Sequence, residues 1–171
     1  GIMNLLMVAT PLAMDFCSHP FAQAAMVIQW HVVGMYAPGL FTGSLIRRYG
    51  TLKVILAGVA LVGGCVAVAL SGTTVTHFLV ALALLGVGWN FMYTGGTTLL
   101  TEAYAPAEKA RAQGANDFAV FATMGVSSFS SGALVSVAGW ERMNMLALPV
   151  VAVVVVAVVW LARLRRAPAA V

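Results

Sequence analysis

The chain has 171 residues, of which 61% are hydrophobic and 8% are charged. Soluble domains carry about 25% charged residues, so this composition excludes a water-soluble domain with an ordinary polar surface. The net charge of +4 comes from short basic groups beside apolar runs, which excludes the single basic patch of a nucleic-acid-binding protein and favours a membrane protein.

Six apolar runs predict six transmembrane helices, so the predicted fold class is an all-α, polytopic membrane protein. A helix needs about 20 residues to cross the hydrocarbon core, and the alternation typical of barrel strands is absent. The first run meets Asp15 before it reaches a full spanning length, so we expect further chain before Gly1. The predicted spans cover residues 1–15, 20–46, 54–72, 77–102, 114–138 and 144–163.

The basic residues predict the orientation of these spans. Arg142 alone lies in the opposite set of loops. Because the cytoplasmic loops of membrane proteins are enriched in Lys and Arg, we expect both chain ends in the cytoplasm and the protein in a bacterial inner (plasma) membrane. Eight of the nine basic residues follow the second, fourth or sixth span: Arg47, Arg48, Lys53, Lys109, Arg111, Arg163, Arg165 and Arg166.

The second predicted span carries His31 near its middle, with Gly34, Pro38 and Thr42 on the same side. An imidazole inside the membrane is unfavourable unless it faces a cavity or a partner. His31 could bind a solute or carry a proton, because its charge changes near neutral pH. A neutral histidine that is hydrogen-bonded to a neighbouring helix is an equally good interpretation.

The third and sixth predicted spans, 54–72 and 144–163, have almost no polar side chains. We therefore expect them to be outer helices that show much of their surface to lipid. The fourth and fifth spans differ, because each carries hydroxyls and an asparagine at spacings that keep them on one helix face. The two stripes are Asn90, Thr94, Thr97, Thr98 and Thr101, and Asn116, Thr123, Ser127, Ser130 and Ser131.

These stripes predict a cavity for a solute, since amides are costly to leave facing lipid. The alternative is structural: Ser and Thr in membrane helices often bond their own i−4 carbonyl or lie at close helix contacts. The run GVGWNF is equally compatible with helix packing through Gly86 and Gly88. The predicted substrate-binding residues are His31, Asn90, Tyr93, Thr94, Thr97, Asn116, Thr123 and Ser127.

Two connections carry a recognisable pattern. The segment PGLFTGSLIRRYGTLK (38–53) is similar to G-x-x-x-D-R-x-G-R-K, with Gly43, Arg48 and Gly50 in place and Arg47 where an acidic residue is expected. The segment EAYAPAEKARAQG (102–114) is similar to P-x-x-x-R-x-x-x-G. In these connections and in its order of polar and apolar helices, the chain resembles the C-terminal six-helix half of a major facilitator superfamily transporter.

The resemblance implies that residues 1–171 form one half of a secondary active transporter of a small organic solute, which works by alternating access. A homologous six-helix half would precede it, the first, second, fourth and fifth helices would face the pathway, and a proton is a possible coupling ion. No metal or other cofactor is expected. The residues predicted to act in gating at the cytoplasmic loops are Gly43, Arg47, Arg48, Gly50, Glu102, Arg111 and Asp117.

Within that set, we expect the carboxylates of Glu102 and Asp117 to pair with Arg47, Arg48 or Arg111. Two other classes of function differ in the residues that they require. An enzyme would require paired acids, a set of metal ligands or an activated serine inside the membrane. Neither the three histidines nor Cys17 and Cys65 are spaced for this. A non-transporting receptor or assembly subunit that binds a partner through the same polar faces stays open as the alternative.

Overall fold

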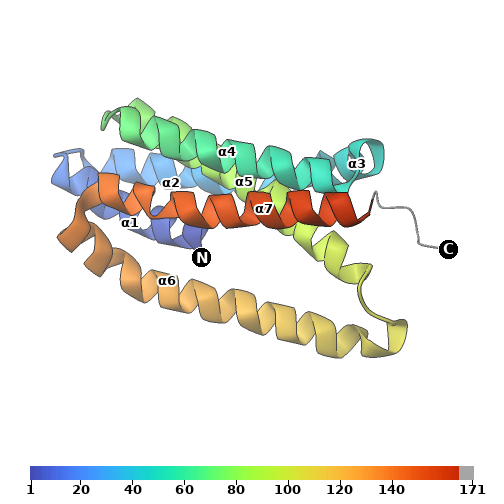
Figure 1. Cartoon of the computed structure of the whole chain (residues 1–171). Coiled ribbons are helices and arrows are strands. Elements are labelled where there is room, and N and C mark those ends of the chain that lie inside the picture. Colours follow the sequence, from blue (N-terminus) through green and yellow to red (C-terminus); the bar gives the residue numbers. More distant parts are fainter. Residues whose placement is uncertain (166–171) are drawn as a thin grey trace.

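The structure is a computed structural model that describes residues 1–165, and its regular elements there are helices (Figure 1). They run α1 Ile2–Phe16, α2 Phe21–Tyr36, α3 Gly39–Tyr49, α4 Thr51–Ser71, α5 Val75–Thr101, the 3₁₀ turn η1 Pro106–Glu108, α6 Lys109–Met145 and α7 Ala147–Leu164. The all-α fold class is therefore confirmed.

Membrane crossing follows from length and composition. Helices α4 and α5 are each long and apolar enough to span a bilayer, and so is the segment 106–164 that contains α6 and α7. Helices α2 and α3 pass the same test only when taken together, and α1 is a shorter apolar helix of 15 residues. The chain is thus an integral membrane protein.

The second span is not the continuous helix predicted for residues 20–46. It breaks into α2 and α3, whose axes differ by 42°. Pro38 lies at the break, and its ring removes a backbone donor and clashes with the preceding turn. Thr42 then donates its hydroxyl to the Pro38 carbonyl at 2.7 Å, which helps to satisfy the backbone at the start of α3.

Two predicted loops are shorter than expected. Only Gly50 interrupts the helical path between α3 and α4, with φ of 89°, a value that favours glycine. The fifth span begins at Lys109 rather than near residue 114 and continues to Met145, with Gly139 at φ of 77° marking a kink. The stretch between the predicted fifth and sixth spans, 139–143, is thus a kink and not a loop, because glycine adopts a positive φ without strain.

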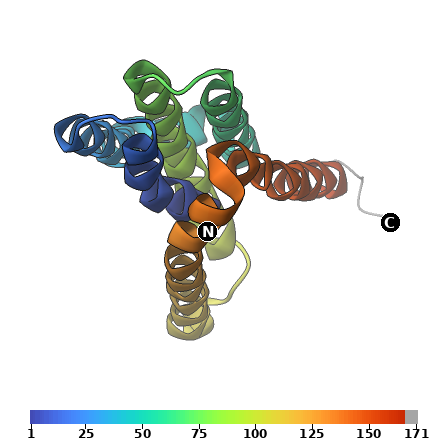
Figure 2. The same ribbon diagram turned by 90° about the vertical axis from the view of Figure 1, so that its left-hand side faces the viewer.

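Helix α5 is the centre of the bundle and packs between α2 and α4. Seen from the end, α6 and α7 diverge from each other, with α6 held mainly by α1 and α7 mainly by α4 (Figure 2). Glycines allow the closest approaches: a Cβ added to Gly88 would lie 2.8 Å from the carbonyl oxygen of Gly58, and one added to Gly34 would lie 3.1 Å from that of Ala83.

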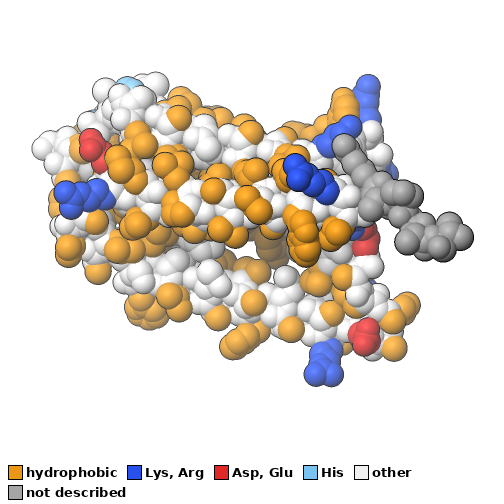
Figure 3. Space-filling model, viewed as in Figure 1, with side chains coloured by type: hydrophobic (Ala, Val, Ile, Leu, Met, Phe, Trp, Pro, Cys, Tyr) orange, Lys and Arg blue, Asp and Glu red, His pale blue; other side chains and the backbone are white. Residues whose placement is uncertain are grey.

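Basic side chains gather at the end of the bundle formed by α3 and the last turn of α7 (Figure 3). Arg142 lies at the opposite end, in the last turn of α6. This distribution agrees with the charge pattern in the sequence. The orientation inferred from that pattern stays a prediction. Arg166, one of the eight basic residues in that argument, lies outside the described residues.

Candidate functional site

A groove between α1, α5 and α6 collects several of the predicted site residues. Its volume is about 330 Å³. Both polar and apolar side chains line it, which suits a solute that has a ring system and hydrogen-bonding groups. The lining residues are Gly1, Met3, Trp89, Tyr93, Asn116, Ala119, Val120, Thr123 and Met124.

Aromatic rings form the α5 wall of this groove. Trp89 and Tyr93 are one helical turn apart, and their rings stack with centroids 4.9 Å apart and an interplanar angle of 14°. Tyr36 of α2 meets Trp89 edge-on, with centroids 6.5 Å apart. Tyr93 is 38% exposed. The exposed part of the Tyr93 ring is therefore available for stacking with a planar ring.

Helix α6 supplies the polar wall. The amide nitrogen of Asn116 lies 3.4 Å from Oδ1 of Asp117, a long hydrogen bond that leaves most of the amide's capacity unused. The hydroxyl of Thr123 donates to the Ala119 carbonyl at 2.7 Å. Because its one proton is used within the helix, Thr123 can offer the groove only an acceptor oxygen and a methyl group.

Asn90 of α5 does not line this groove. Its side chain lies against the break between α2 and α3. It is 7% exposed, and its amide nitrogen donates to the Met35 carbonyl at 2.7 Å. Its Oδ1 lies 2.7 Å from the hydroxyl of Thr42. The last carbonyls of a helix have no donor within that helix, so Asn90 supplies one to α2 from a neighbouring helix.

His31 is fully buried where α2 crosses α5. Its Nδ1 lies 2.7 Å from the Leu82 carbonyl, and because a carbonyl only accepts, Nδ1 carries the proton in this contact. Nε2 is buried and has no hydrogen-bond partner within the described chain. The geometry is that of the neutral, helix-bonded histidine considered from the sequence.

The remaining predicted binding residues, Thr94, Thr97 and Ser127, lie outside the lining of the groove. Thr97 donates to backbone carbonyls one turn back, at 3.0 Å, and Thr94 is half-buried on the same helix. Ser127 faces α1, where it accepts a hydrogen bond from the amide of Asn4 at 3.0 Å. The Thr97 hydroxyl thus bonds its own helix, as in the structural alternative, and the role of Thr94 and Thr97 in solute binding stays a prediction.

Asn4 is a functional candidate that the sequence did not reveal. It is 3% exposed, and its amide nitrogen also lies within hydrogen-bond distance of the Met124 carbonyl and of the Ser128 hydroxyl. Ser131 extends the same contact by donating to the Leu5 carbonyl at 2.9 Å. These bonds attach α1 to α6 beside Met3 and Met124, and so fix the position of the α6 wall of the groove.

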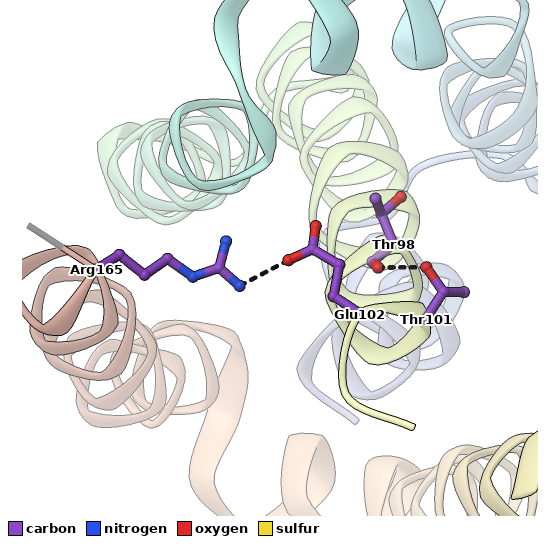
Figure 4. A network of polar contacts seen from close by, with 4 residues as sticks. All are labelled: Thr98, Thr101, Glu102 and Arg165. Carbon is purple, nitrogen blue, oxygen red and sulfur yellow. Dashed lines mark hydrogen bonds and ion pairs between the residues drawn. The ribbon is translucent and has the colours of Figure 1, made fainter. Parts of the chain in front are cut away.

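At the predicted cytoplasmic end, Glu102 pairs with a different partner from those expected. Its Oε2 lies 2.7 Å from the guanidinium of Arg165, joining the end of α5 to the end of α7, while Thr101 donates to the Thr98 carbonyl beside it (Figure 4). Arg165 reaches Glu102 because α7 runs back along α4 and α5 to the same end of the bundle. Both partners are 45% exposed.

The other predicted gating residues are exposed and separate from that pair. Arg47 donates to Ser44 at 3.0 Å, and Arg48 lies over the ring of Tyr49, 5.3 Å from its centroid. Gly43, Gly50, Arg111 and Asp117 are also exposed.

Comparison with known proteins gives the chain a family. The Major Facilitator Superfamily matches residues 1–171. The chain is 45% identical over 156 residues to "Riboflavin transporter RfnT" of Brucella anthropi, covering 91% of this chain and 39% of that protein. It is 30% identical over 161 residues to "Uncharacterized MFS-type transporter YdeG" of Bacillus subtilis, covering 93% of this chain and 37% of that protein.

The chain therefore spans about two fifths of the length of these relatives. No solved structure gives a significant match. The match over the full chain agrees with the helical fold and with the resemblance carried by the two connections at 38–53 and 102–114. These observations together place the chain in the Major Facilitator Superfamily.

Proposed function

We propose that the chain is one half of a secondary active transporter that moves a small organic solute by alternating access. The groove between α1, α5 and α6 would form one wall of the solute pathway, and a second six-helix half would provide the other. The observation that carries this proposal is the meeting of Trp89, Tyr93 and Asn116, from two helices, in one groove.

The same groove supports a more specific solute class, namely a planar aromatic ring system with hydrogen-bonding edges. The parallel rings of Trp89 and Tyr93 suit stacking, and the amide of Asn116 can both donate and accept. The relative from Brucella anthropi is named for riboflavin. Riboflavin has this chemistry, so it is the first solute to test.

The test is uptake of labelled riboflavin by vesicles that contain the full-length protein. Changing Tyr93 to Ala is expected to raise KM about tenfold, because one stacking surface is lost. Changing Tyr93 to Phe keeps the ring and is expected to leave KM within about twofold. Phe129, an exposed α6 aromatic outside the groove lining, serves as the control when changed to Ala.

Two outcomes would contradict this proposal. Equal KM values for the Ala and Phe variants of Tyr93 would remove the groove from solute recognition. Absence of movement of riboflavin or any other tested solute, together with a stable stoichiometric partner, would favour the receptor or assembly subunit.

Proton coupling is also a proposal. His31 is fully buried among the packed helices and can change its charge near neutral pH, so it is the residue of this half to examine first. Its separation from the lining of the groove favours a structural role, and the carrier would then lie in the other half.

A further inference from the structure

A second groove, separate from the solute groove, lies between α3, α4 and α5 at the basic end of the bundle. Its volume is about 210 Å³, and its lining is Leu45, Tyr49, Lys53, Val54, Ala57 and Phe91. Three helices contribute to it, so it is a feature of the packing and not of one helix surface. A water molecule occupies about 30 Å³ in the liquid, so the groove has the volume of about seven water molecules. This is room for part of one long apolar chain.

The interior of this second groove is apolar. Val54 is 5% exposed, Leu45 and Phe91 are half-buried, and Ala57 is small enough to leave the space open. In a membrane protein, such a space at the outer surface of the bundle meets acyl chains and not water. A long molecule that occupies this groove is therefore expected to be a hydrocarbon chain.

The rim of the second groove is cationic and aromatic. Lys53 and Tyr49 both line it and are exposed, and the Arg48 guanidinium lies 5.3 Å from the centre of the Tyr49 ring. Tyr and Lys at a membrane surface keep their polar ends in the headgroup layer. The rim thus combines positive charge with the Tyr49 hydroxyl, which are groups that suit a lipid phosphate.

These positive charges have no carboxylate nearby along the chain. Residues 16–101, which include α2, α3, α4 and α5, contain no Asp or Glu. Within the described residues, the ion pair found joins Glu102 to Arg165 and involves none of the rim residues. The counter-charge must come from outside this part of the chain.

We propose that the second groove binds one anionic phospholipid from the membrane leaflet at the α3 end. An acyl chain lies against Leu45, Ala57 and Phe91, and the phosphate lies at Lys53 and Tyr49. A zwitterionic lipid fits less well, because its ammonium group would approach Lys53 and Arg48. If the predicted orientation is right, this lipid comes from the cytoplasmic leaflet, where anionic lipids attract basic segments.

The test uses the purified full-length protein and native mass spectrometry, with phosphatidylglycerol or phosphatidylethanolamine added at matched concentrations. Changing Lys53 to Gln is expected to weaken phosphatidylglycerol binding about fivefold, the factor that corresponds to about 1 kcal/mol for one basic residue at an anionic surface. Lys109→Gln is the matched control, because Lys109 is exposed at the start of α6 and does not line the groove.

A second variant tests the apolar part independently. Ala57→Trp fills the groove and is expected to remove the tightest bound phosphatidylglycerol, whereas Ala67→Trp, on an exposed part of α4 outside the groove, is expected to keep it. Equal loss in Lys53→Gln and Lys109→Gln would overturn the proposal, and so would equal retention of the two lipids by the unmodified protein. Each variant is first shown to elute as a single species, so that misfolding is not counted as lost lipid.

Discussion

The amide nitrogen of Asn90 on α5 donates a hydrogen bond to the Met35 carbonyl in the last turn of α2, at 2.7 Å. The same side chain accepts from Thr42 on α3, whose one hydroxyl proton is shared with the Pro38 carbonyl. One side chain on the central helix therefore holds both sides of the break in the second span.

Replacing Asn90 by Ala is expected to destabilise the full-length protein by about 1–3 kcal/mol, because the Met35 carbonyl loses its donor while the Thr42 hydroxyl keeps only the Pro38 carbonyl. Thermal unfolding in detergent measures this. Thr97→Val is the control and is expected to have a small effect, because the Thr97 hydroxyl bonds only its own helix. An unchanged unfolding temperature with lost uptake would instead make Asn90 a solute contact, as the sequence predicts.

The two polar residues of the α6 wall are expected to behave differently. Asn116→Ala is expected to raise KM for a solute about fivefold to tenfold, because the groove loses an amide donor and acceptor. Thr123→Val is expected to change KM less than about twofold, since the hydroxyl proton already serves the Ala119 carbonyl. Initial uptake rates over a range of solute concentrations distinguish them, and a larger effect at Thr123 would contradict the assignment.

His31 allows a structural role to be separated from a proton-carrying one. His31→Asn keeps a hydrogen-bond donor near the position of Nδ1. This variant is expected to fold and to take up solute. His31→Ala leaves a space and removes the donor, and is expected to lower stability by about 1–3 kcal/mol. If uptake by the Asn variant no longer responds to an imposed pH gradient while folding is kept, His31 carries the coupling proton.

Asn4 is expected to be more sensitive than its place in an apolar run suggests. Asn4→Ala removes the buried amide whose two protons are shared among Ser127, Ser128 and the Met124 carbonyl, so a loss of about 1–3 kcal/mol in unfolding free energy is expected. Ser136→Ala on the same α6 is the control, because Ser136 is exposed and bonds only the Gly132 carbonyl. Comparable unfolding temperatures for the two variants would show that α6 is held by other contacts.

The pair between Glu102 and Arg165 is expected to contribute little to stability. Both side chains are 45% exposed, and exposed ion pairs give about 0–1 kcal/mol. A double-mutant cycle with Glu102→Gln and Arg165→Gln measures the coupling, which is expected to fall as salt is added. A coupling that is larger and independent of salt would indicate a buried pair in the assembled protein.

The fold class and most helices could be predicted from the sequence because long apolar runs have few structural alternatives in a membrane. The break at Pro38 was predictable in principle, since proline interrupts a helix. The segment around Pro38, however, has the same hydropathy as a continuous span, so the apolar pattern alone does not reveal the break. The helical residues at 109–113 could not be distinguished from a loop, because charged residues suit both an exposed helix start and a connection.

The candidate site was predictable in part. Tyr93, Asn116 and Thr123 meet in the groove, whereas Asn90 and Ser127 carry similar polar groups and face other helices. Spacing fixes which residues share a helix face, but it does not fix what that face meets. Asn4 was missed for the same reason, because its partners lie more than a hundred positions away along the chain.

The contacts at Gly34, Gly58 and Gly88 have a mechanical consequence. Where backbones approach this closely, no side chain can rotate to absorb a shift, so we expect α2, α4 and α5 to move as one body. Helix α5 has 27 residues, about 40 Å at 1.5 Å per residue, and tilting it by about 10° around its midpoint would displace each end by about 3.5 Å. Under the proposed alternating access, a small rotation of this helix group would therefore suffice to open the pathway at one end of α5 and close it at the other.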